Sequence, residues 1–172
     1  MLAHWENFYL ITGGAAGALI GLMFVVVSLT SHISLDRALR GVAIYMSPTI
    51  HNFATVLALS AVATAPIPSW MLADVLAAAA LAGVAASLRP SWLLRPWLHH
   101  LTAHWTDFWW YGMVPLAAYL GLGGTAAAVW REAPCTPFLF AVVTVVVLMV
   151  AVRNAWDLII WVTPRAKPPP EP

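Results

Sequence analysis

Charged residues are scarce in this chain of 172 residues, where Asp, Glu, Lys and Arg together make up 9%. A soluble domain carries roughly a quarter of its residues as these four types, because water must wet its surface. Here 62% of the residues are hydrophobic, so the exterior must itself be largely apolar. The shortage of charge excludes an ordinary soluble domain, and the lack of a basic run or acidic tail argues against a nucleic-acid partner.

Cysteine and the common catalytic motifs are also missing. Cys135 is the only cysteine, which excludes an internal disulfide and any site that needs several thiolates. The sequence contains no Gly-x-Ser-x-Gly elbow, no phosphate-binding loop and no His-Glu-x-x-His motif. We therefore expect a protein that is not an enzyme and holds no cofactor. No Lys or Arg precedes the first apolar run, so we expect a retained span rather than a cleaved signal peptide.

Long apolar runs are what the sequence has in abundance. A hydrocarbon core about 30 Å thick needs about 20 helical residues, and prolines or charges separate five stretches of that length. The predicted spans are 8–31, 42–65, 70–88, 108–130 and 138–163. The third contains Asp74 and is the weakest, so four spans are the alternative. The sequence predicts one all-α integral membrane bundle over 1–163, with an interfacial segment at 89–107 and a Pro-rich, flexible tail at 164–172.

Basic residues are distributed unequally between the two sides of this bundle. Only Arg131 lies on one side, whereas six lie on the other: Arg37, Arg40, Arg89, Arg95, Arg165 and Lys167. Short loops retain Lys and Arg on the cytoplasmic side of a membrane. The distribution therefore predicts an N-terminus outside and a C-terminus in the cytoplasm.

Glycines in the first span recur at intervals of four residues, at Gly13, Gly17 and Gly21, and Gly121 belongs to a similar pattern in the fourth span. Small residues at this spacing let two helices approach closely in lipid, where apolar burial does not drive association. The face packs either within one bundle or between copies in a homo-oligomer, and the sequence leaves both interpretations open.

Ionisable residues inside spans are rare and deserve a functional hypothesis. Arg153 and Asp157 are four residues apart, so they can pair on one helical face. We predict that the second and fifth spans meet and form one polar cluster in the cytoplasmic half, with Asn154 or Arg153 bonding a carbonyl that Pro48 leaves free. The predicted cluster consists of Ser47, His51, Asn52, Arg153, Asn154 and Asp157. It is either a neutral structural pair with its neighbours or the lining of a hydrated cavity.

Histidines gather in the loop between the third and fourth spans. If that loop is helical, His100, His104 and Asp107 share one face, and this combination can bind zinc. The loop also alternates Trp, Leu and His, as an amphipathic helix lying in the membrane interface does. The interfacial helix is the favoured interpretation, and metal binding is the alternative.

Three segments resemble a family of small, uncharacterised bacterial multi-pass inner-membrane proteins: Trp5-x-Asn7-Phe8-Tyr9, the run Ala15–Leu29, and Arg153-Asn154-Ala155-Trp156-Asp157-Leu158. The resemblance implies a bacterial cytoplasmic membrane and a first span packed through its glycines. It brings no assigned activity.

The leading functional hypothesis is an oligomeric channel or transporter-like protein for an ion or small solute, with the polar cluster lining the path. The alternative is a non-catalytic scaffold or accessory subunit that docks on a larger membrane complex through its glycine faces. A membrane-bound metalloenzyme is a third hypothesis. The expected partners are the lipid bilayer and either further copies of the chain or another membrane protein.

Overall fold

The computed structural model describes residues 2, 4–29, 46–94 and 109–162, and every structural statement below concerns this part of the chain. Its regular structure is helical throughout, which confirms the predicted all-α fold. The elements are α1 (Glu6–Leu29), α3 (Ser47–Thr64), α4 (Ser69–Leu94), the short π-helix η3 (Trp109–Met113), α6 (Val114–Trp130) and α7 (Thr136–Val162).

Four helical segments are long and apolar enough to cross a membrane, and they are Glu6–Val26, Ser69–Leu88, Trp109–Trp130 and Thr136–Ile160. The third predicted span, which Asp74 made the weakest, is among them with a mean hydropathy of 2.0. The described part of α3 has 18 residues and is not among them. Polar side chains in its first turns lower its apolar character. The chain is thus a multi-pass helical membrane protein, and its least apolar helix is the second rather than the third.

The end of α4 also differs from the prediction. The predicted span ends at residue 88, yet α4 continues through Arg89 and Pro90 to Leu94. Proline removes one backbone N–H and releases one carbonyl, and a helix survives this where water can satisfy the released group. The apolar span ends at Leu88. Pro90 therefore lies beyond the apolar part of the helix, and the helix can continue through it.

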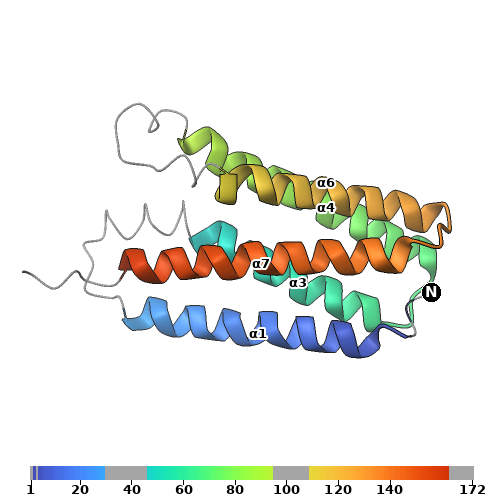
Figure 1. Cartoon of the computed structure of the whole chain (residues 1–172), viewed down its shortest axis with the longest axis horizontal. Helices are drawn as coiled ribbons and strands as arrows, with labels where there is room; N and C mark the ends of the chain where they lie inside the picture. Colours follow the sequence, from blue (N-terminus) through green and yellow to red (C-terminus); the bar gives the residue numbers. More distant parts are fainter. Residues whose placement is uncertain (1, 3, 30–45, 95–108, 163–172) are drawn as a thin grey trace, which may run out of the picture.

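The helices lie side by side as a bundle in which sequence neighbours run in opposite directions (Figure 1). α1 packs against α3, and α4 packs against α6. α7 joins the two pairs, because it contacts α3, α6 and α1. The N-terminus and the turns before α4 and α7 lie at one end of the bundle, which we call the N-terminal end. The other end holds the last residues of α1, α4 and α7.

Both described turns at the N-terminal end contain residues that cannot continue a helix. α3 ends at Thr64, after which Ala65 is extended with ψ 141° and precedes Pro66. α6 ends at Trp130, and Glu132 then takes a left-handed φ of 52°. Such backbone changes reverse the chain within a few residues. The turns are short, so they keep the consecutive helices adjacent.

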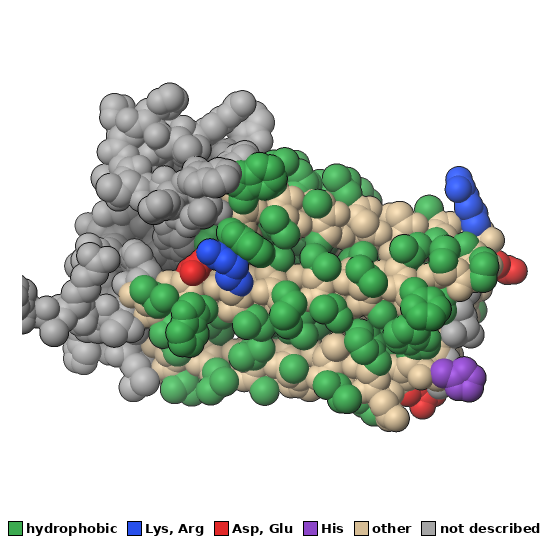
Figure 2. Space-filling model, viewed as in Figure 1, with side chains coloured by type: hydrophobic (Ala, Val, Ile, Leu, Met, Phe, Trp, Pro, Cys, Tyr) green, Lys and Arg blue, Asp and Glu red, His purple; other side chains and the backbone are tan. Residues whose placement is uncertain are grey.

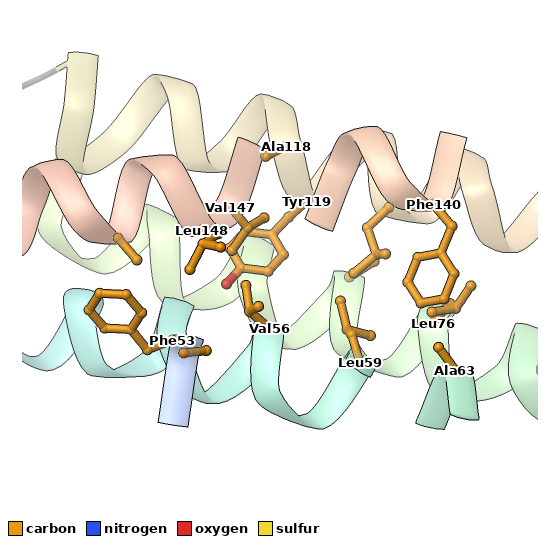
Figure 3. Packing of buried hydrophobic residues seen from close by; sticks show 14 of the residues in the cluster. Phe53, Val56, Leu59, Ala63, Leu76, Ala118, Tyr119, Phe140, Val147 and Leu148 are labelled. Carbon is orange, nitrogen blue, oxygen red and sulfur yellow. The ribbon is translucent and has the colours of Figure 1, made fainter. Parts of the chain in front are cut away.

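Apolar side chains fill the interior of the bundle and also cover its outside. Phe53 of α3, Leu76 of α4 and Phe140 of α7 are completely buried, and Figure 3 shows them at different points along the interior between the helices. Apolar side chains also spread over the outer face in Figure 2. Large ones that are more than 60% exposed include Leu10, Phe24, Leu81, Leu120, Phe138 and Trp156. An apolar exterior of this kind is suited to lipid rather than water.

The predicted glycine stripe of α1 divides between an interior and an exterior face. A Cβ added at Gly13 would stand 2.8 Å from Ser60 Cβ of α3, and one added at Gly17 would stand 3.9 Å from Leu57. A Cβ at Gly21 would meet nothing within 4 Å. Gly121 of α6 similarly approaches α7. Close helix approach within one chain thus accounts for Gly13, whereas Gly21 faces open space.

Candidate functional site: polar residues at the helix junctions

The start of α6 departs from regular α-helical geometry. η3 is a single π turn that runs directly into α6, and Pro115 lies at the start of α6. Proline lacks an N–H, and its ring crowds the carbonyl four residues earlier, so the helix ahead of it widens. In the π register the Trp110 carbonyl would pair with the N–H five residues later, which Pro115 lacks. This carbonyl is therefore left for a tertiary partner.

Asn154 of α7 is that partner. Its Nδ2 donates to the Trp110 carbonyl at 3.3 Å, and the Tyr111 hydroxyl donates to the backbone carbonyl of Asn154 at 3.1 Å. Asn154 and Tyr111 are both buried. Asn154 Oδ1 has no hydrogen-bond partner within the described residues, so the side-chain amide is held through its donor alone. Two opposed hydrogen bonds fasten η3 to the C-terminal half of α7.

Arg153 and Asp157 form the ion pair that their spacing predicts, with 2.6 Å between Nη1 and Oδ2. The guanidinium carbon of Arg153 also lies 4.5 Å from the centroid of the Trp110 ring, which is a favourable cation–π distance. The two charged side chains remain 35% and 32% exposed. Figure 2 shows a basic and an acidic side chain next to each other on an otherwise apolar face. The pair therefore lies on the outside of the bundle and not in its centre.

A second polar group lies inside the bundle, where the side chain of Tyr119 reaches from α6 to α3. The hydroxyl of Tyr119 donates to Asn52 Oδ1 at 2.8 Å and is 3.3 Å from Thr55 Oγ1. Tyr119 is completely buried, and its ring lies directly on Gly83 of α4, where any Cβ would overlap the ring carbons. Gly83 therefore gives Tyr119 the space to cross from α6 to α3.

His51 stands at the edge of this second group. Its ring centroid lies 5.9 Å from that of Tyr119, and the rings are tilted by 48°. Its Nε2 is buried and has no hydrogen-bond partner among the described residues. His51 thus packs against an aromatic ring without entering a hydrogen-bond network in this part of the chain.

Five of the six residues predicted to form one cluster are divided between two groups. α3 and α7 do contact each other, as predicted. Within the described residues, however, no hydrogen bond or ion pair joins the polar side chains of α3 to those of α7. Asn52 pairs with α6, Asn154 pairs with η3, and Ser47 is exposed. The carbonyl four residues before Pro48 lies outside the described residues, and Asn154 donates elsewhere.

Three aromatic residues that bind the polar groups were missed by the sequence prediction: Trp110, Tyr111 and Tyr119. Tryptophan and tyrosine near span ends are typical of the membrane interface, and this pattern explains Trp109. It gives no sign that Trp110 and Tyr111 contact α7. A tyrosine in the middle of an apolar span was the available signal for Tyr119, because a buried hydroxyl needs a partner.

The remaining candidates lie elsewhere. His100, His104 and Asp107 fall outside the described residues. Among the residues that are described, no group of three or more His, Cys, Asp or Glu side chains could hold a metal ion.

Comparison with known proteins adds no homologue to this picture, because no family model, curated protein or solved structure matches the chain. Function must therefore be argued from the residues alone.

Proposed function

We propose that this protein is a non-catalytic accessory protein of the membrane that docks on another transmembrane protein. The docking surface is the outer face of η3 and the C-terminal half of α7, defined by Trp110, Val152, Arg153, Trp156 and Asp157, and is called the α7–η3 surface below. The half-exposed ion pair within the apolar span Thr136–Ile160 carries the proposal.

The cost of exposing charge to lipid favours a covering partner. Placing one charged side chain in a membrane span costs about 2.5–3.5 kcal/mol on insertion scales, and pairing recovers part of this cost. Arg153 and Asp157 are joined through a single nitrogen and a single oxygen. Within the described residues, the other guanidinium N–H groups and Asp157 Oδ1 have no hydrogen-bond partner. A partner helix can supply these bonds and exclude lipid from the pair.

Apolar side chains surround the pair and suit helix packing. Val152 is 37% exposed, Trp156 is 64% exposed and Ile160 is 61% exposed. An interface with an aromatic anchor and one desolvated charge pair resembles the centres of known protein interfaces, where a few such residues dominate affinity. The hydrogen bonds between Asn154 and η3 hold this surface rigid before a partner arrives, which lowers the entropic cost of docking.

Site-specific photo-crosslinking in native membranes tests the proposal. A photo-reactive amino acid at Val152 should give one defined adduct with a different protein, whereas an adduct with a second 18.6-kDa copy would show self-association instead. The same amino acid at Leu81, which is 73% exposed on α4, should give lipid adducts only. Equal protein adducts at both positions would contradict docking on the α7–η3 surface.

A charge swap separates docking from folding. Combining Arg153→Asp with Asp157→Arg keeps an i,i+4 pair and places the acidic residue first, which is the favourable order along a helix. The swap should leave the amount of folded protein nearly unchanged and should reduce the Val152 adduct about tenfold. An adduct that survives the swap would show that the pair does not recognise the partner.

The proposed membrane is the bacterial cytoplasmic membrane, which the resemblance supports, with the N-terminal end of the bundle outside, which the distribution of Lys and Arg supports. Cys135 offers a direct test, because this single cysteine is exposed in the turn between α6 and α7. A membrane-impermeant maleimide should label it in intact cells and should not label Cys135→Ser. Labelling that requires permeabilised cells would reverse the proposed orientation.

A channel or transporter-like function is the second candidate. The buried Tyr119–Asn52 hydrogen bond supports it, because polar groups inside the bundle could contact a solute. It ranks second because apolar side chains such as Phe53, Val56 and Leu59 fill the described interior. Liposomes with the purified protein should conduct ions or protons if this function is correct, and Tyr119→Phe and Arg153→Met should alter the flux. A silent wild type would exclude the channel under the conditions tested.

A further inference from the structure

We propose a binding site for a primary ammonium group in a pocket at the N-terminal end of the bundle, independent of the α7–η3 surface. The pocket has a volume of about 320 Å³ and lies between the start of α1 and the turn that joins α3 to α4. Glu6 and the last residues of α3 contribute its polar wall, and Leu2, Val62, Ile67 and Leu72 contribute its apolar wall.

Backbone carbonyls without a partner line this pocket because of the prolines in the turn. The last four carbonyls of an α-helix have no partner within the helix. At the end of α3, the Val62 carbonyl accepts the Ala65 N–H, and the Ala61 carbonyl accepts the Thr64 hydroxyl. Pro66 and Pro68 have no N–H to offer. Within the described residues, the carbonyls of Ala63 and Thr64 are therefore left without a hydrogen-bond donor, and both residues line the pocket.

The charges around the pocket favour a cation. The C-terminus of α3 carries about half a negative charge, and the N-terminus of α4 at Ser69, which also lines the pocket, carries about half a positive charge. These two helix ends roughly cancel, and the N-terminus of α1, where Glu6 lies, adds about half a positive charge. The carboxylate of Glu6 outweighs these partial charges, so the pocket is negative overall and favours a cation. Glu6 forms no ion pair within the described residues, so its carboxylate is available to a ligand.

The shape of the pocket favours an organic ammonium over a metal ion. Within the described residues no group of three or more His, Cys, Asp or Glu side chains could hold a metal ion, so a metal here would have Glu6 as its only charged ligand. An ammonium group instead presents three N–H donors, which match the Glu6 carboxylate and the carbonyls of Ala63 and Thr64. The apolar wall can cover a short carbon chain attached to the nitrogen. The ammonium can belong either to a free amine or to an ethanolamine lipid headgroup, since both present the same chemistry.

Binding of n-propylammonium to the full chain in phosphatidylcholine nanodiscs tests the site, because that lipid has no N–H donor on its nitrogen. Calorimetry should show saturable binding of n-propylammonium and none of n-propanol. Glu6→Gln should weaken binding about tenfold, which is the loss of one charge-assisted hydrogen bond, and Glu6→Asp should retain most of it. Glu132→Gln is the matched control, because Glu132 is exposed at the same end of the bundle outside the pocket.

The two ligand sources give different results when phosphatidylethanolamine replaces phosphatidylcholine in the nanodiscs. Loss of n-propylammonium binding would identify the lipid headgroup as the occupant, and unchanged binding would identify a free amine. Both outcomes support the site. Equal binding of n-propanol, no saturable binding, or equal weakening by the Glu6→Gln and Glu132→Gln variants would overturn it. None of these results depends on whether the α7–η3 surface binds a partner.

Discussion

Replacing Gly13 by alanine should destabilise the bundle, whereas the same replacement at the next residue, Gly14, should not. The two positions differ only in what their side chains would meet. A Cβ at Gly13 would stand 2.8 Å from Ser60 Cβ and 3.3 Å from Ser60 Oγ, and one at Gly14 would meet nothing within 4 Å. The Ser60 hydroxyl also pairs with that of Thr12 at 3.1 Å. The comparison therefore measures helix approach with identical side-chain chemistry.

The expected magnitude follows from the contact distance. Carbon atoms pack comfortably at about 3.5–4.0 Å, so α1 and α3 must separate by roughly an ångström to admit the methyl group. Overpacking of this kind costs about 1–3 kcal/mol. Alanine recovers up to about 1 kcal/mol, because it favours the helix more than glycine does. The free energy of unfolding should thus stay constant or rise by up to about 1 kcal/mol for Gly14→Ala, and that of Gly13→Ala should lie about 1–3 kcal/mol below that of Gly14→Ala.

Unfolding by sodium dodecyl sulfate in mixed micelles, followed by tryptophan fluorescence, gives both free energies. A double-mutant cycle with Ser60→Gly sharpens the test, because removing the Ser60 Cβ makes room for the added methyl group. The cost of Gly13→Ala should then shrink by about 1 kcal/mol. Equal stabilities of the Gly13→Ala and Gly14→Ala variants would refute the close approach of α1 and α3 at this point.

Three further substitutions and one control substitution test the junctions in the same unfolding assay. Gly83→Ala should cost about 3 kcal/mol or more, because its Cβ overlaps the buried ring of Tyr119, and Gly124→Ala, with open space around it, should be neutral. Tyr119→Phe should cost about 1–3 kcal/mol, since it leaves Asn52 Oδ1 buried without its donor; an unchanged stability would contradict that bond. Asn154→Ala should cost about 1–2 kcal/mol through loss of the bond to η3, and no measurable cost would contradict it.

Composition and helical spacing predict the individual helices well, because each helix depends on residues that are close together in the sequence. An apolar run of sufficient length must be helical in lipid, since each backbone group needs an internal partner, and this argument alone predicts helices at α1, α3, α4, α6 and α7. The Arg153–Asp157 pair follows from i,i+4 geometry on one helix in the same way. Asp74 did not remove its helix from the candidate spans, because a single carboxylate in the first turns leaves the remaining apolar length intact.

Tertiary partners were harder to predict, because equal depth in the membrane does not determine which neighbouring helix a side chain faces. The predicted cluster groups His51 with Arg153 because both lie in the cytoplasmic half of their spans. In the structure, His51 instead packs against Tyr119 of α6, and Arg153 lies over Trp110. The rotation of α3 about its axis does not follow from its residues alone, and a rotation of about 100°, equivalent to one residue, changes the neighbour that a side chain meets.

Pro115 explains the most specific of these partnerships, and it can be tested by restoring what proline removes. Pro115→Ala supplies an N–H that can bond to the Trp110 or Tyr111 carbonyl within the helix. Asn154 Nδ2 then competes with this local N–H for the Trp110 carbonyl, so its hydrogen bond contributes less to the stability of the bundle. Asn154→Ala should therefore cost about 1 kcal/mol less in a Pro115→Ala background than in the wild type. If its cost is the same in both, proline does not create the vacancy that Asn154 fills, and the amide must bind η3 for another reason.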